Sequence, residues 1–411
     1  MKKFLIVSIS LILVAAVAFG ASLFHYIDVT KDDSTPSQVS KNDKENKKED
    51  KEDKKEPVVD AKMPSDWNDN GIFKDNYDKA YSYVLSLSDE QLVGQVLIGT
   101  CPVDDTASTT ATKFALSGYV FSADNFAMMD ESGVKEHIAS FNKNASTPMI
   151  MAVKEEGGAV TAISDLDAFP QYDFYSPRDI FAQGGLDALK ESEQQKADML
   201  KSVGINLNLA PVCDMGEEMN HIMYSRSLGG TTQDTCDYVS NTTEISQSKG
   251  VSVALKHFPG YGTCPDTLES VVVDTREIST FETNDFKPFE AGVNKGAHVV
   301  MMSNALVQNL DPNCVVSLSD YAHTVLKDRI GFSGLIMTDN LNNADYSAYA
   351  NGNDVYVQAV LAGNDLVMVS NVEEAYKAIL GGLNDGTIDK EILQKACTRV
   401  VAYKYSAGIM D

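Results

Sequence analysis

The sequence predicts an α/β protein built as an eight-stranded parallel barrel, a (β/α)8 fold of the TIM type. Eight short runs rich in Val, Ile, Leu and Met recur after residue 94, and longer stretches with helical spacing separate them. Strands that are apolar along their whole length are buried on both faces, as in parallel sheets covered by helices. Eight such units match the strand number of the barrel. A doubly wound open sheet would give a similar pattern and is the alternative fold.

The N-terminal residues 1–30 are typical of a membrane anchor or signal peptide. Two lysines precede 21 uncharged residues, Phe4–Phe24, which is enough helix to cross a hydrocarbon core of about 30 Å. This length favours an uncleaved anchor, although the small residues Ala18 and Gly20 would also suit cleavage. The basic start would stay in the cytoplasm. We therefore expect an exported protein, anchored in the cell membrane with its bulk extracellular, or secreted if the signal is cleaved.

Residues 31–62 predict a disordered, charged linker. Between residues 31 and 60 there are 8 Lys against 10 Asp plus Glu and very few apolar side chains, so ordering entropy is not offset by burial. Because the linker is almost neutral, the net charge of −25 lies mainly in residues 63–411, the expected barrel domain. So acidic a domain argues against a nucleic-acid partner.

The composition also bounds the cofactors. The six cysteines form no CxxC pair and no short Cys/His spacing of the kind that holds zinc. We predict neither a metal nor a cofactor, and the sequence selects no disulfide pairing.

The eight predicted strands follow one another at barrel-like intervals, with helices such as 284–295 and 320–328 between them. They are residues 95–99, 118–122, 148–153, 206–210, 251–255, 298–302, 335–338 and 365–369.

Polar or ionisable residues follow five of these strands directly. They are residues 154–158, 211–214, 256–257, 303–304 and 339–340. Any one of these positions could merely cap the next helix, because Asp, Ser and Asn are preferred there. In a barrel, however, the loops that follow the strands meet at one face, where active sites lie. The convergence of five polar segments predicts a functional site at that face.

The segment that leaves the fifth strand carries a resemblance to a known family. Lys-His-Phe-Pro-Gly-Tyr-Gly at residues 256–262, followed by Asp266 and Thr267, resembles the signature of glycoside hydrolase family 3, particularly its single-domain β-N-acetylglucosaminidases. Residues 208–214 are similar to the family's Asn-x-Ala-Pro-Val-x-Asp, and residues 226–229 to its Arg-Ser-Phe-Gly. Residues 334–341 resemble the segment with the nucleophilic Asp, and residues 362–365 match Ala-Gly-x-Asp. The similarity spans roughly residues 75–400 in matching order.

This resemblance implies a role for each polar position. Asp339 would be the nucleophile of a retaining glycosidase, in which a second group, normally about 5–5.5 Å away, protonates the leaving oxygen and later activates water. The substrate-binding set would be Lys154, Asp214, Arg226, Lys256, His257 and Tyr261, with Tyr261 as a ring on which a sugar could stack. The partner would be a carbohydrate, and a neutral sugar fits the acidic domain better than an acidic one.

Two positions depart from the family pattern. The loop normally ends in Asp-Ser/Thr-His, with the His as acid/base, whereas this chain has Asp266, Thr267 and Leu268. Leucine cannot transfer a proton, so Asp266 with a water, or the neighbouring Glu269, would have to take that role.

The other departure follows the third strand, where the family reads Asp-x-Glu-Gly-Gly-Arg-Val-x-Arg. Here Lys154 replaces the Asp, and Ala159 and Ala162 replace the two Arg.

Two kinds of function remain open from the sequence. The first is hydrolysis of terminal β-linked N-acetylhexosamine from glycans such as cell-wall fragments. The alternative is a catalytically inactive barrel that binds a glycan or a protein, motivated by Leu268 and the altered loop after the third strand. A family 3 glycosidase with another sugar specificity is the third possibility.

Overall fold

The computed structural model describes residues 61–216, 219, 222–265, 267, 270–342 and 344–411. The predicted anchor, nearly all of the predicted linker, and Asp266, Leu268 and Glu269 lie outside the described residues. Within the described ranges, no helix is both long and apolar enough to cross a membrane.

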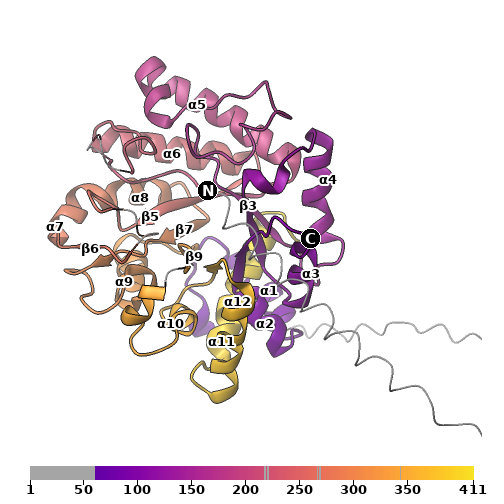
Figure 1. The fold of residues 1–411 in the computed structure, drawn as a ribbon. Coiled ribbons are helices and arrows are strands. Elements are labelled where there is room, and N and C mark those ends of the chain that lie inside the picture. The colour runs from indigo at the N-terminus through magenta and orange to yellow at the C-terminus, as the bar shows by residue number, and fades with distance from the viewer. Residues whose placement is uncertain (1–60, 217–218, 220–221, 266, 268–269, 343) are drawn as a thin grey trace, which may run out of the picture. The chain divides into compact units, whose positions relative to one another are not determined.

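The eight predicted strands form a single parallel sheet that curls into a barrel (Figure 1). Its order is β10-β1-β2-β3-β4-β5-β7-β9. A parallel bridge between Met337 and Leu366 brings the two end strands together, and Thr338 N donates to Leu366 O at 3.1 Å. The predicted barrel is confirmed, and the open-sheet alternative is wrong. The strands are β1 (Leu97–Thr100), β2 (Gly118–Phe121), β3 (Ile150–Val153), β4 (Leu207–Asn208), β5 (Ser252–Phe258), β7 (Val299–Met302), β9 (Leu335–Thr338) and β10 (Val367–Val369).

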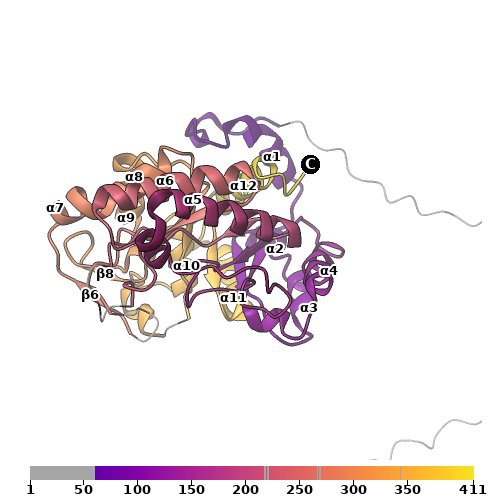
Figure 2. The same cartoon turned by 90° about the horizontal axis from the view of Figure 1, so that it is seen from above.

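Helices surround the strands on the outside, and the long α5 and α6 run side by side over one flank (Figures 1 and 2). The strands are therefore covered on both faces, which explains why they are apolar throughout. The helices are α1 (Tyr77–Val84), α2 (Asp89–Gln95), α3 (Ala107–Lys113), α4 (Glu131–Asn142), α5 (Pro177–Val203), α6 (Thr232–Ser248), α7 (Ile278–Thr280), α8 (Phe286–Val293), α9 (Asp320–Thr324), α10 (Val355–Leu361), α11 (Val372–Asp385) and α12 (Lys390–Ser406). A small two-stranded sheet pairs β6 (Val273–Asp274) with β8 (Leu306–Val307).

Two helices are shorter as α-helices than their spacing predicts. The expected helix at 284–295 is α8, preceded by a π-helical segment at Phe281–Asp285. The expected helix at 320–328 begins as α9 and continues as a π-helical segment at Val325–Arg329. π-helical turns are rare and occur mostly as single turns inside α-helices, so an α-helical spacing is the expected reading of these segments.

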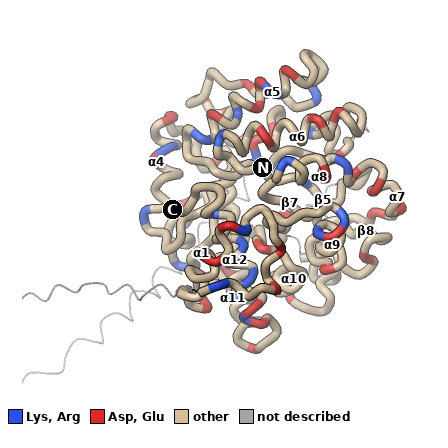
Figure 3. Tube along the Cα trace, turned by 180° about the vertical axis from the view of Figure 1, so that it is seen from behind, with Lys and Arg blue, Asp and Glu red and all other residues tan. Residues whose placement is uncertain are grey.

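The last helix, α12, is tied to the end of the barrel where β9 and β10 begin. The guanidinium of Arg399 donates to Asp365 Oδ1 at 3.0 Å and to Gly334 O at 2.5 Å, and Asp365 Oδ2 accepts from Ile336 N at 2.9 Å. Asp365, the last residue of the family-like segment 362–365, is therefore a structural residue at the end opposite to the site. Figure 3 shows that acidic and basic residues are interspersed over the outer helices.

Candidate active site

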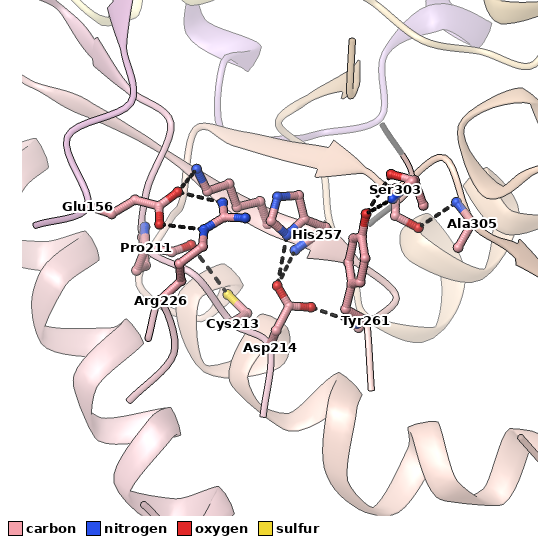
Figure 4. A network of polar contacts seen from close by, with 12 residues as sticks. Glu156, Pro211, Cys213, Asp214, Arg226, His257, Tyr261, Ser303 and Ala305 are labelled. Carbon is pink, nitrogen blue, oxygen red and sulfur yellow. Dashed lines mark hydrogen bonds and ion pairs between the residues drawn. The ribbon is translucent and has the colours of Figure 1, made fainter. Parts of the chain in front are cut away.

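A buried carboxylate, Glu156, joins three segments at the carboxyl ends of the strands (Figure 4). It follows β3, and its Oε1 lies 2.5 Å from Nζ of Lys256 on β5. Arg226, from the loop after β4, donates to it twice, from Nε at 2.8 Å and Nη2 at 2.7 Å. Such a bidentate pair fixes the plane of the guanidinium as well as its position. Glu156 therefore locks Lys256 and Arg226 in place.

Burial and charge act against each other in this cluster. Burial alone would raise the pKa of Glu156, but Lys256 and Arg226 hold it well below its ordinary value. Burial lowers the pKa of Lys256 to about 8, although Glu156 opposes that shift. Glu156 is therefore ionised at neutral pH, and Lys256 is held charged only by its partner.

His257 is oriented by Asp214, which follows β4. Asp214 Oδ2 accepts from His257 Nδ1 at 2.8 Å, and Asp214 Oδ1 accepts from Tyr261 N at 2.7 Å. Because a carboxylate only accepts, Nδ1 carries a proton and Nε2 is left as the second functional atom of the ring. The same carboxylate thus sets the histidine and the start of the loop after β5.

That loop depends on two glycines in left-handed conformations. Gly260 has φ +123°, and a Cβ there would lie 2.5 Å from Asp285 Oδ1; Gly262 has φ +55°, and a Cβ there would lie 2.4 Å from the Arg276 guanidinium. Arg276 donates to Gly260 O and to Asp285 Oδ1, each at 2.9 Å, and also pairs with Asp274. An ion-paired arginine, Arg276, therefore holds the Pro/Gly-rich motif in place.

Asp339 follows β9 and is 8% exposed. Its backbone N–H donates to Met302 O at 2.9 Å, and its Oδ1 accepts from Asn340 N at 2.8 Å. Burial alone would raise the pKa of Asp339, but the charges of Lys154 and His257 lower it overall. The carboxylate is thus rigidly held and ionised, which is what a nucleophile requires.

Lys154 and Glu155, which precede Glu156, have different environments. Lys154 is half-buried, and its charge acts on Asp339 across the barrel. Glu155 is fully buried and accepts from Ala162 N at 2.9 Å and Ile163 N at 2.8 Å. Glu155 therefore closes its own loop and does not face the site cluster.

The structure gathers seven of the predicted site residues at the carboxyl ends of the strands: Lys154, Asp214, Arg226, Lys256, His257, Tyr261 and Asp339. Tyr261 is 3% exposed, and its ring packs edge-on against His257 with centroids 5.3 Å apart. In this conformation it positions its neighbours, and its contact with a sugar stays a prediction. Asp266 and Glu269 lie outside the described residues, so the identity of the acid/base also stays a prediction.

Two residues that sequence reasoning missed support this cluster. Arg178, at the start of α5, donates to Tyr224 O at 2.7 Å and Gly216 O at 2.6 Å, which holds the loop that carries Arg226. Lys196, also on α5, is buried and donates to Glu156 O at 3.2 Å. Neither residue stands in a motif, and each partner is distant in sequence, so only the fold reveals them.

Comparison with known proteins agrees with this architecture. A family model described as "Glycosyl hydrolase family 3 N terminal domain" matches residues 88–403. The chain is 27% identical over 278 residues to a beta-hexosaminidase of Xylella fastidiosa (strain M12), covering 65% of this chain and 81% of that one. It is 29% identical over 277 residues to a beta-hexosaminidase of Stenotrophomonas maltophilia (strain K279a), with the same coverage.

Solved structures show the same fold. A glycoside hydrolase family 3 beta-N-acetylglucosaminidase from Paenibacillus sp. str. FPU-7 superposes with a TM-score of 0.72 at 24% identity, covering 79% of this chain and 63% of that one. A beta-N-acetylhexosaminidase from Beutenbergia cavernae DSM 12333 gives 0.66 at 23% identity, covering 79% and 99%. Because the family model spans most of the chain and the barrel agrees, this protein belongs to glycoside hydrolase family 3.

Proposed function

We propose that this glycoside hydrolase removes terminal β-linked N-acetylhexosamine from glycans, such as wall fragments, by a retaining mechanism with Asp339 as the nucleophile. The observation that carries the proposal is the environment of Asp339, which is buried, fixed through two backbone contacts and kept ionised by nearby cations. The beta-hexosaminidases among its relatives support the choice of sugar.

The fixed side chains of Arg226 and His257 suit the binding of sugar hydroxyls. Arg226 uses Nε and Nη2 on Glu156, and among the described residues Nη1 has no hydrogen-bond partner, so it is available to a hydroxyl. His257 uses Nδ1 on Asp214, so Nε2 is left in the same way. Because both side chains are already oriented, little conformational entropy is lost when the sugar binds.

In the first step, an Asp339 oxygen attacks the anomeric carbon as the bond to the leaving oxygen breaks, and the acid/base donates its proton to the leaving oxygen. In the second step, water attacks the same carbon, the bond to Asp339 breaks, and the acid/base regains a proton from that water. Asp266 or Glu269 would be the acid/base, because Leu268 cannot serve. The proposal includes an extracellular location, with residues 1–30 as anchor or signal.

The test uses the full-length chain and two β-N-acetylglucosaminides, one with a 2,4-dinitrophenyl leaving group and one with an unactivated sugar leaving group. Turnover of both substrates that disappears in Asp339→Asn would support a complete enzyme. A matched control is Asp187→Asn, because that side chain is 98% exposed.

Turnover of the activated substrate alone would indicate a working nucleophile with a weak acid step, because a good leaving group needs no proton. Absence of Asp339-dependent turnover on either substrate would contradict the proposal. The second candidate, a binding barrel motivated by Leu268, would then be tested by glycan binding.

A further inference from the structure

Lys154 is a cation in the barrel mouth that has no direct partner in the described part of the chain. It directly follows β3 and is half-buried, and among the described residues its Nζ forms neither a hydrogen bond nor an ion pair. The two carboxylates beside it in sequence are committed elsewhere, since Glu155 holds its own loop and Glu156 holds Lys256 and Arg226. Its charge is therefore available to a ligand.

The arrangement of the strands shows where Lys154 lies relative to Asp339. β3 and β9 are four strands apart in either direction around the ring, so they lie on opposite sides of the mouth. Lys154 nevertheless contributes more than any other charge to lowering the pKa of Asp339, which follows β9. Lys154 directly follows β3 and Asp339 directly follows β9 at the same end of the barrel, so both residues lie at the mouth where the proposed mechanism needs a sugar.

Lys154 loses the charge of Asp339 during that mechanism. Lys256 and Arg226 share the single carboxylate of Glu156, so neither of them leaves a spare negative charge for Lys154. The charge of Lys154 acts on the Asp339 carboxylate. In the glycosyl-enzyme that carboxylate becomes a neutral ester. Among the described residues, the remaining carboxylate of the cluster, Asp214, is bound by His257 and by the Tyr261 backbone. Lys154 then has no ion-pair partner among them, which is unfavourable for a partly buried cation. A negative charge on the bound sugar would remove this penalty.

We infer that Lys154 selects sugars that carry an anionic group, a carboxylate or a sulfate or phosphate ester, on the ring bound beside Asp339. This inference rests on the proposed function, because it names the class of sugar that Asp339 attacks. It replaces the expectation of a neutral sugar, which was drawn from the net charge of −25 alone. That long-range field is screened over about 8 Å at physiological ionic strength, whereas a direct contact between Lys154 and a sugar anion would be screened much less.

The test compares four full-length proteins: wild type, Lys154→Met, Lys154→Arg and the control Lys143→Met, which removes an exposed lysine from the end of α4. The probes are 2,4-dinitrophenyl β-glycosides of N-acetylglucosamine, its 6-sulfate, its 6-phosphate and its 6-carboxylate. The readout is the ratio of kcat/KM for each charged sugar to that for the neutral one, so a general effect of Lys154 on Asp339 cancels.

Wild type should prefer at least one charged sugar by about tenfold or more, as expected for a contact between charged groups. Lys154→Met should abolish the preference, while Lys154→Arg and Lys143→Met should keep it. The ranking of the three charged sugars then identifies which anionic group Lys154 prefers: sulfate, phosphate or carboxylate. Equal use of neutral and charged sugars by wild type, or a preference unchanged in Lys154→Met, would overturn the inference. An equal loss on all sugars in Lys154→Met would also do so, because Lys154 would then act only on Asp339.

Binding separates this inference from the proposed function. Calorimetric titration with free N-acetylglucosamine, its 6-sulfate, its 6-phosphate and its 6-carboxylate needs no turnover. Tighter binding of a charged sugar that is lost in Lys154→Met would support the inference even if Asp339→Asn showed that no hydrolysis occurs. Binding of the charged sugars no tighter than that of the neutral one would overturn it. Circular dichroism of each variant confirms that the comparison is made between folded proteins.

Discussion

Replacing Glu156 by glutamine removes the carboxylate that Lys256 and Arg226 share. The glutamine keeps the size of the side chain and one acceptor oxygen, so packing is preserved while the charge is lost. We expect Glu156→Gln to destabilise the protein by about 2–3 kcal/mol at pH 7.

The magnitude follows from three features of the cluster. Breaking a buried ion pair by removing one partner costs about 3–5 kcal/mol. The Arg226 side chain is 20% exposed, so it can turn partly toward water. Beside Glu156 the pKa of Lys256 is about 8. In the variant that carboxylate no longer raises it, so Lys256 can lose its proton at pH 7 for about 1 kcal/mol or less. Hydration of Arg226 and deprotonation of Lys256 both reduce the loss of stability in the variant. At pH 9 Lys256 is already largely neutral in the wild type, so the substitution should cost less stability there.

The assay is urea unfolding at pH 7 and pH 9, with equal slopes required before the midpoints are compared. The control is Glu373→Gln, which removes an exposed i,i+4 partner of Lys377 and should change stability by about 0.5 kcal/mol or less. A loss no larger than that of the control, or one that grows from pH 7 to pH 9, would refute the reasoning.

Three further changes test other parts of the structure. Gly260→Ala should destabilise by about 2–4 kcal/mol, because φ is +123° and the new Cβ would meet Asp285; Gly381→Ala, which has no neighbour within 4 Å, should be neutral or stabilising in the same urea assay. Arg276→Met should destabilise the protein by about 3 kcal/mol at pH 7, because the carboxylates of Asp274 and Asp285 lose their ion-pair partner. The loss of stability should be smaller at pH 4, where these carboxylates can be protonated. Equal losses at both pH values would contradict this. Burial lowers the pKa of Lys404 to about 7 from 10.5, so the unfolded state binds more protons between these values and wild-type stability should rise with pH across that window. Lys404→Met should flatten this rise in urea midpoints measured from pH 6 to 10, and an unchanged slope would show that Lys404 is not the cause.

The sequence predicted the barrel well because its strands are buried on both faces. A run such as Val299–Met302 has no polar side to orient, so only a parallel sheet covered by helices suits it. The site was predicted where a motif lies in one segment, as for Lys256 and His257. The sequence also predicted that Asp339 lies at the same face as these residues, because the carboxyl ends of parallel strands meet there.

The contacts that hold the site were not predictable in the same way. Glu156 and Arg226 are 70 residues apart, and Asp214 and His257 are 43 apart, so no local pattern pairs them. The sequence placed Glu155 and Glu156 side by side without showing that one closes a loop and the other anchors two cations. That difference arises from where the chain turns after β3, which depends on tertiary contacts such as those of Asn208 with the backbone of Glu155.

Lys154 and Leu268 both affect the first step of the proposed reaction, in which the glycosyl-enzyme forms. By lowering the pKa of Asp339, the charge of Lys154 makes that carboxylate a weaker nucleophile but a better leaving group when water releases the sugar. Leu268 removes the family's usual proton donor, which is needed in the first step and less so for good leaving groups. Both changes therefore burden formation of the glycosyl-enzyme, and the loss of the histidine also removes the family's usual base for its hydrolysis. A sugar anion that pairs with Lys154 would offset part of this burden, because it reduces the positive charge acting on Asp339 and restores its nucleophilicity. In this way the charge of the substrate can tune the step that the loss of the histidine makes slow.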